Sequence, residues 1–192
     1  MADDISLLDS SVYAPPKAFD PPHPVPSGQK RPPIFFATSP LKLVVMSIVT
    51  LGFYELFWFY ANWKRLRRRE HSRISPFWRT FFALFFCYEL FRIVKRTAND
   101  ENVVARYSPA LLGLGWVLAN FLWMVPRFGW LLTYCAALVL VPVQKTMNDV
   151  NRALCPDHDP NTRFTAWNVV GIVLGGAVLA MAVWGNLQPV QN

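Results

Sequence analysis

The chain has 192 residues, of which 53% are hydrophobic, 15% aromatic and only 16% charged, and its formal net charge is +7. Soluble domains usually carry about 25% charged residues, and here most charges lie between long apolar runs, so a sizeable soluble domain is excluded and a membrane protein is indicated. The basic residues gather at the ends of apolar segments, which favours contact with anionic lipid headgroups and argues against nucleic acid as a partner.

Residues 1–38 are predicted to form a disordered, Pro-rich tail. Eight prolines fall between Pro15 and Pro33, and proline fixes φ and has no backbone donor, so the stretch favours polyproline II or disorder. We favour a flexible leash; the alternative is a docking segment, for which Pro21-Pro22-His23-Pro24 supplies the minimal PxxP spacing.

The first apolar segment runs from residue 41 to 63 and is long enough to span a bilayer. At 1.5 Å per residue its 23 residues reach about 34 Å as one helix. Gly52 lies near its middle. It serves either as a simple packing contact or as a break between two half-helices.

The second segment, residues 76–94, is interrupted by Arg79, Glu89 and Arg92. The uncharged stretch between Arg79 and Glu89 is only about 13 Å of helix, under half of the hydrocarbon thickness. An interfacial or re-entrant helix is therefore predicted rather than a clean span.

The remaining segments are predicted as a hairpin, an amphipathic stretch and a final span. Residues 110–125 and 128–143, joined by Pro126-Arg127, are each short for a span and suggest a tight helical hairpin. Residues 144–154 show helical periodicity, and residues 155–165 form a polar loop. The cleanest span is 166–184, with Trp167 and Trp184 at its ends as interface anchors, and a short tail follows from 187 to 192.

Together these segments predict an all-α, polytopic membrane helix bundle over residues 39–186, with three or four spans and one or two interfacial or re-entrant helices. The rule that basic residues lie on the cytoplasmic side permits two membrane topologies. In the first, four segments span and 76–94 lies on the cytoplasmic surface. In the second, 41–63 also re-enters by bending at Gly52, and every basic residue except Arg127 is cytoplasmic. We favour four spans over three.

A dense basic cluster follows the first apolar segment and a wall of aromatic residues. An apolar helix that ends in aromatic and then basic residues is typical of the cytoplasmic face of a bilayer. The cluster is predicted to contact lipid headgroups through Lys64, Arg65, Arg67, Arg68 and Arg69.

Four charged residues inside the apolar segments form a candidate intramembrane polar site. An ionised carboxylate near the bilayer centre costs about 2.5–3.5 kcal/mol on insertion scales, so Glu55 and Glu89 need partners. Glu89 can meet Arg92 three residues on, whereas Glu55 has no basic neighbour on its own helix and is expected to pair with Arg79 or Arg92. A proton or substrate site is the functional interpretation, and we favour a structural ion pair.

Small residues in the last span predict close helix packing. Gly171 and Gly175 form a GxxxG pattern and Gly176 follows. Such residues let two helices approach closely. The two helices belong either to the same bundle or to two copies of the chain, and the sequence does not distinguish these alternatives.

Catalytic, metal and cofactor motifs are absent from the sequence. Cys87, Cys135 and Cys155 form no CxxC pair, and Asp157-His158-Asp159 lacks the later residues of a calcium loop. No P-loop, dinucleotide-binding, HExxH or GxSxG pattern occurs. We therefore expect no metal, no cofactor and no catalytic residues.

The first apolar segment resembles a family of small bacterial inner-membrane proteins with no established activity. The resemblance is carried by Ser39-Pro40-Leu41-Lys42, Thr50-x-Gly52-x-Tyr54, Phe57-Trp58-x-Tyr60 and Asn62-Trp63-Lys64, with counterparts of 75–79, 142–144 and 163–168. It implies a multi-pass protein of the bacterial inner membrane and brings no catalytic residues.

The sequence thus favours a non-enzymatic membrane scaffold or accessory subunit, with a basic cytoplasmic face on anionic lipid and a membrane-protein partner or a second copy as its contact. The alternative is a small transporter or lipid-handling protein that uses the intramembrane Glu and Arg residues. An integral-membrane enzyme is the third and weakest class. A cavity that reaches Glu55 would favour transport, and a sealed, ion-paired interior would favour the scaffold.

Overall fold

A computed structural model describes residues 32–70, 73–125 and 132–187, which fold as seven α-helices and no strand. The all-α class is thereby confirmed for the described residues. One helix among them, over Ala166–Gly185, is long and apolar enough to cross a membrane, and the multi-pass arrangement stays a prediction. The helices, joined in part by 3-10 turns, are α1 Pro40–Val49, α2 Phe53–Arg69, α3 Pro76–Phe81, α4 Ala83–Asp100, α5 Pro109–Phe121, α7 Ala136–Leu154 and α8 Ala166–Leu187.

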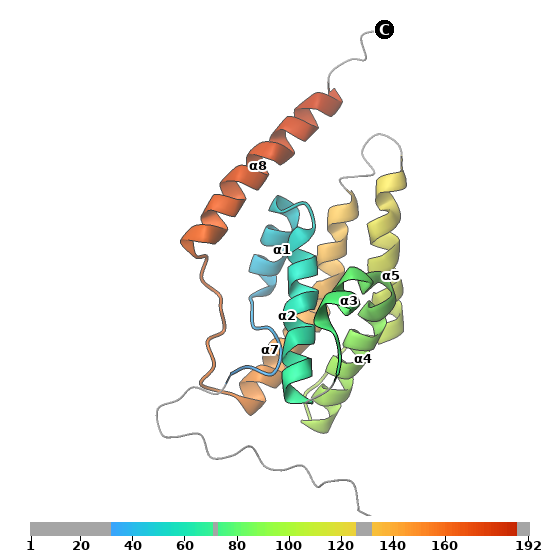
Figure 1. The fold of residues 1–192 in the computed structure, drawn as a ribbon, viewed down its shortest axis with the longest axis vertical. Coiled ribbons are helices and arrows are strands. Elements are labelled where there is room, and N and C mark those ends of the chain that lie inside the picture. The colour runs from blue at the N-terminus through green and yellow to red at the C-terminus, as the bar shows by residue number, and fades with distance from the viewer. Residues whose placement is uncertain (1–31, 71–72, 126–131, 188–192) are drawn as a thin grey trace, which may run out of the picture. The chain divides into compact units, whose positions relative to one another are not determined.

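The first apolar segment is a helical hairpin and not one straight helix (Figure 1). Helix α1 ends at Val49, and two left-handed residues, Leu51 (φ 54°) and Gly52 (φ 87°), reverse the chain before α2 begins. The backbone N–H of Phe36 donates to Asn62 Oδ1 at 2.9 Å. One continuous helix would hold the two ends of the segment about 34 Å apart. A straight span over 41–63 is therefore wrong, and the break at Gly52 is what the chain adopts.

Helices α3 and α4 replace the second predicted segment. They meet at a bend at Phe82, whose backbone (φ −97°, ψ 38°) is not helical. Helix α3 packs against α2, and α4 packs against α5 and α7. The segment is thus two helices at a bend rather than one clean span.

Helices α5 and α7 pack against each other as the two arms of a hairpin. The joining residues Pro126 and Arg127 lie outside the described residues. Helix α7 runs without interruption through Pro142 to Leu154, so the amphipathic stretch 144–154 is its second half rather than a separate element.

Residues 34–38 were assigned to the tail by their proline-rich surroundings, but they are part of the core. Phe35 and Thr38 are fully buried, and Phe36 and Ala37 nearly so. An extended buried segment needs partners for its backbone groups, and here side-chain amides supply them. Asn151 accepts from Phe35 N–H at 2.9 Å and donates to the Phe35 carbonyl at 3.0 Å.

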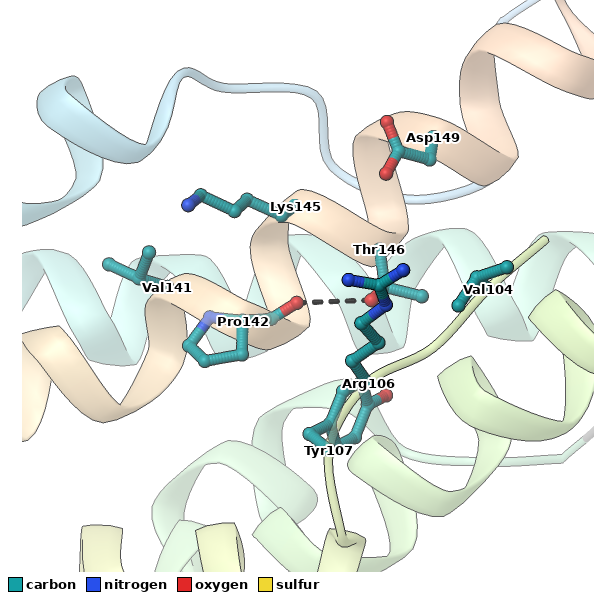
Figure 2. A pocket seen from close by; sticks show the side chains of 8 residues that line it. All are labelled: Val104, Arg106, Tyr107, Val141, Pro142, Lys145, Thr146 and Asp149. Atoms are coloured by element: carbon teal, nitrogen blue, oxygen red, sulfur yellow. Dashed lines mark hydrogen bonds between the residues drawn. The ribbon is translucent and has the colours of Figure 1, made fainter.

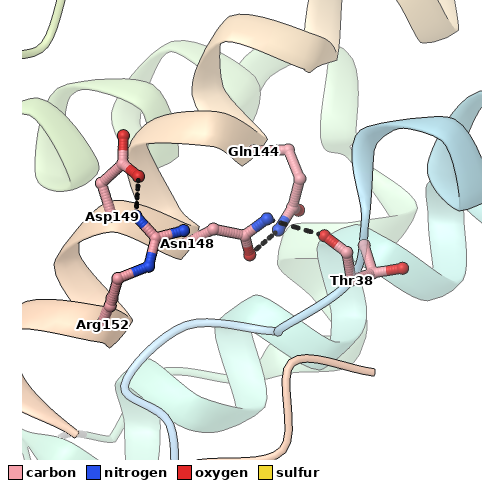
Figure 3. Close-up of polar contacts among 5 residues, drawn as sticks. All are labelled: Thr38, Gln144, Asn148, Asp149 and Arg152. Atoms are coloured by element: carbon pink, nitrogen blue, oxygen red, sulfur yellow. Dashed lines mark hydrogen bonds and ion pairs between the residues drawn. The ribbon is translucent and has the colours of Figure 1, made fainter. Parts of the chain in front are cut away.

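The same amide pattern continues along the segment (Figure 3). Gln144 Nε2 donates to the Phe36 carbonyl at 3.1 Å, and Asn148 Nδ2 donates to the Thr38 carbonyl at 2.8 Å. The amide side chains of α7 therefore point toward residues 35–38, whereas its charged residues Lys145 and Arg152 are exposed. The amides supply the hydrogen bonds that a neighbouring strand would otherwise supply. The folded region begins several residues before the predicted boundary at 38.

Helix α8 packs against α1 through its glycines. A Cβ on Gly175 would overlap the backbone carbonyl oxygen of Val49, whereas a Cβ on Gly176 would meet nothing within 4 Å. A Cβ on Gly171 would make an ordinary van der Waals contact with the Met46 side chain. Of the two uses left open for the GxxxG pattern, packing inside the bundle is the one this contact supports. Most other large apolar side chains of α8 are exposed, including Val173, Leu174 and Trp184.

Candidate functional site

Glu55 is positioned by the turn that reverses the first hairpin. It lies in the first turn of α2, three residues after the left-handed Gly52, where the helix N-terminus favours a negative group. Glu55 is only 5% exposed to solvent. The local sequence therefore places a carboxyl group close to the tip of the hairpin and turns it into the protein.

The partner of Glu55 is a tryptophan and not an arginine. The indole N–H of Trp116, on α5, donates to Glu55 Oε2 at 2.7 Å. The expected ion pair with Arg79 or Arg92 is wrong: neither guanidinium contacts Glu55. The described residues supply Glu55 with this one neutral donor, whereas the two oxygens of a carboxylate together accept up to about four bonds.

A cavity of about 360 Å³ opens beside this carboxyl group. Its walls come from the α1–α2 turn with the start of α2, the α3–α4 bend, the second half of α5, and the two 3-10 turns Leu122–Met124 and Thr133–Cys135. Aromatic and aliphatic side chains dominate the walls. They are supplied by Gly52, Glu55, Leu56, Phe81, Ala83, Leu84, Trp116, Asn120, Phe121, Trp123, Thr133 and Tyr134.

Some of the polar groups that line this cavity already have hydrogen-bond partners, and others do not. Asn120 Nδ2 donates to the Trp116 carbonyl of its own helix at 2.9 Å. The Thr133 hydroxyl is buried and has no partner among the described residues. An apolar cavity that contains a carboxyl group and a hydroxyl group without a hydrogen-bond partner is suited to an apolar ligand that carries one polar head.

The other three charged residues of the predicted site are not part of this cavity. Arg79 Nη1 lies 2.7 Å from Glu89 Oε1, and the guanidinium stacks over the rings of Trp63 (4.5 Å) and Phe86 (5.1 Å). Arg92 is exposed, and its guanidinium lies 6.0 Å from the Tyr88 ring. The expected Glu89–Arg92 pair is therefore replaced by Arg79–Glu89, which ties α3 to α4.

The basic cluster divides into an exposed end and an inner pair. Arg67, Arg68 and Arg69 are exposed in the last turn of α2, where positive charge favours the helix C-terminus. Lys64 and Arg65 are half-buried, and Arg65 lies 5.1 Å from the Phe36 ring. Lipid contact through these residues stays a prediction.

Sequence reasoning missed the two features that define the site. Trp116 lies 61 residues from Glu55, and no local spacing links them. Thr133 falls in a short 3-10 turn, Thr133–Cys135, that carries no motif. No three His, Cys, Asp or Glu side chains group as metal ligands within the described residues.

Comparisons of the chain with protein-family models, with curated proteins and with solved structures give no match. The family resemblance of the first hairpin therefore stays a prediction.

Proposed function

We propose that this chain is a lipid-handling membrane protein whose Glu55 cavity holds an apolar molecule with one amine or hydroxyl head. The observation that carries the proposal is a buried carboxyl group that has no basic partner among the described residues and faces a 360 Å³ apolar cavity. Burying such a group without an ion pair is expensive in a membrane, and intramembrane carboxyl groups are by default functional candidates. A ligand head that donates a hydrogen bond supplies the missing partner.

The proposed membrane arrangement uses α8 as a span and the α1–α2 hairpin as a one-leaflet insertion. The apolar part of α2, from Phe53 to Trp63, extends about 16 Å before the first lysine. This length is close to half of a hydrocarbon core of about 30 Å. The tip of the hairpin then lies near the bilayer midplane, and its basic end lies at the surface.

Helix α8 gives an independent measure of the same depth. Gly175, which contacts Val49 at the hairpin tip, is nine residues beyond Ala166, where α8 begins. Nine residues of helix rise about 14 Å, again close to half of the hydrocarbon thickness. Both lengths support the proposal that the hairpin tip and the Glu55 cavity lie deep in the membrane.

A returning hairpin places the N-terminal residues on the same side as the Arg67–Arg69 cluster. This corresponds to the arrangement in which every basic residue except Arg127 is cytoplasmic, so it also satisfies the positive-inside rule. Helix α8 is then left to carry the chain outward.

Cysteine labelling of intact cells tests this arrangement. In a background without native cysteines, Ser27→Cys and Arg69→Cys are both expected to be protected from a membrane-impermeant maleimide until the membrane is permeabilised. Asn192→Cys, beyond α8, is expected to label at once. Immediate labelling of Ser27→Cys together with protection of Arg69→Cys would contradict the hairpin insertion.

Quenching of tryptophan fluorescence tests the cavity, because Trp116 and Trp123 line it. The probes are a dibrominated long-chain amine, the matching alcohol and the methyl ether of that alcohol. The amine and the alcohol are expected to quench saturably and the ether, which has no donor, to quench only weakly. Glu55→Leu is expected to weaken amine binding at least about tenfold, which corresponds to about 1.4 kcal/mol.

Two further variants separate loss of the ligand contact from loss of the fold. Glu55→Gln keeps an acceptor for Trp116 and is expected to retain alcohol binding while weakening amine binding. Glu89→Gln changes a carboxyl group outside the cavity and is expected to leave both ligands unaffected. Equal quenching by all three probes in the wild-type protein would refute the proposed ligand class.

The scaffold is the second candidate, and the exposed Arg67–Arg69 cluster favours it. These three guanidinium groups have no ion-pair partner in the described parts of the chain. Pull-down with and without the N-terminal residues tests for a partner, and the truncation must stop at residue 31 because residues 34–38 belong to the core. Unchanged partners after truncation would count against a docking role of the tail.

A further inference from the structure

A second cavity, of about 410 Å³, lies on the outer face of α7 (Figure 2). Its walls come from the segment that leads into α5 and from the middle of α7, and it shares no residue with the Glu55 cavity. Arg106 and Lys145 both line it, each from a different wall. Two cations from positions far apart in the sequence thus line one cavity. Figure 2 draws their side chains pointing in different directions, and because both are exposed, both can turn toward one ligand.

Both cations are free to bind a ligand. Neither the Arg106 guanidinium nor the Lys145 ammonium has a hydrogen-bond or ion-pair partner within residues 32–70, 73–125 and 132–187. Both side chains are exposed, so neither is held in place by packing. Such donors favour an anion, and the planar guanidinium is well suited to phosphate.

The other polar groups of the cavity are already engaged. The Thr146 hydroxyl donates to the Pro142 carbonyl at 3.1 Å (Figure 2). The Tyr107 hydroxyl donates to the Phe91 carbonyl at 3.0 Å, and burial raises the pKa of this phenol, so it stays neutral. Asp149, the acidic group of the wall, lies 3.0 Å from Arg152 and is partly neutralised by it (Figure 3).

The lining of the cavity combines apolar and charged side chains. Val141 and Pro142 belong to the apolar half of α7, and Lys145 is the first charged residue after it. The same transition from apolar to charged groups occurs where acyl chains meet headgroups in a bilayer. A phosphate ester with an apolar body matches this mixed lining.

We propose that this cavity is a binding site for a phosphate group, in which Arg106 and Lys145 hold the phosphate oxygens and Val141 and Pro142 contact the apolar part of the molecule. The phosphate belongs either to an anionic glycerophospholipid or to a soluble phosphate compound. The site is independent of the Glu55 cavity.

Native mass spectrometry of the full chain in detergent tests the site. The probes are phosphatidylglycerol and a diacylglycerol with the same acyl chains, which differ by the phosphate-bearing head. One tightly bound phosphatidylglycerol is expected, with diacylglycerol at least about tenfold weaker. The double variant Arg106→Gln/Lys145→Gln is expected to weaken the first phosphatidylglycerol at least about tenfold.

A charge-matched control separates this site from general attraction to anionic lipid. Arg67→Gln/Arg68→Gln removes the same charge from the exposed basic cluster and is expected to change the first bound lipid less than about threefold. Inorganic phosphate in the low millimolar range distinguishes the two sources. Displacement of the lipid supports the site and assigns it to a soluble phosphate, and retention of the lipid supports it and assigns it to a phospholipid.

Three results would overturn the proposal. They are unchanged lipid binding in Arg106→Gln/Lys145→Gln, an equal loss in both double variants, and diacylglycerol binding as tight as phosphatidylglycerol. Thermal unfolding of both double variants, which change only exposed residues, is expected to match that of the wild type.

Discussion

Gly175→Ala is expected to destabilise the folded protein by about 1–3 kcal/mol, because overpacking a filled contact has a cost of that order. The added Cβ would overlap the Val49 carbonyl oxygen, which is backbone and cannot move aside as a side chain can. Either α8 or the tip of the α1–α2 hairpin must shift. Thermal unfolding of the purified protein in detergent, followed with a thiol-reactive dye, measures the effect.

Gly176→Ala is the matched control for this prediction. It gains the same helix propensity, and its Cβ meets nothing within 4 Å. Its unfolding temperature is expected to equal or slightly exceed that of the wild type. If the two alanines shifted the unfolding temperature equally, the contact between α8 and α1 would be ruled out.

Asn151→Ala is expected to have a second large effect, on the buried segment 34–38. The amide of Asn151 satisfies both the N–H and the carbonyl of Phe35, and all of these groups are buried. Each backbone group left without a partner costs about 1–3 kcal/mol. The loss should therefore exceed that of most single substitutions, which are near 1 kcal/mol.

Hydrogen exchange of the Phe35 amide gives the direct measurement. Its exchange is expected to accelerate in Asn151→Ala well beyond what global destabilisation explains. Asn99→Ala serves as the control, because Asn99 is an exposed asparagine in the last turn of α4. Slow exchange at Phe35 in Asn151→Ala would show that the segment is held in another way.

The sequence predicted the all-α class, because apolar periodicity and segment length carry that information, but it did not predict where the helices break. It left the route of the first segment open. A glycine within an apolar run is equally compatible with packing and with a break, and the decision rests on a left-handed conformation at Leu51, which leucine seldom adopts. Only tertiary contacts, such as that between Phe36 and Asn62, select the hairpin.

The candidate site was predicted in part. The cost of burying charge singled out Glu55 and Glu89 correctly as residues that need partners, but the partners themselves are set by folding. The sequence did not mark Trp116 as a partner of Glu55, because tryptophan is a large apolar residue with only one N–H group that can donate a hydrogen bond. No signal in the sequence indicated the role of Gln144 and Asn151, because no local spacing links their amides to the extended segment that they bind.

The dependence of residues 34–38 on amides far along the chain has a consequence for biogenesis. Phe35 must wait for Asn151, which is 116 residues later, and at about 5–20 residues per second the ribosome needs roughly 6–23 seconds to produce it. During that interval Phe35 and Phe36 are not yet buried, and their peptide groups lack their final hydrogen-bond partners. A nascent-chain chaperone or an early encounter with the lipid surface would fill this gap, and premature termination before Asn151 should yield a product prone to degradation.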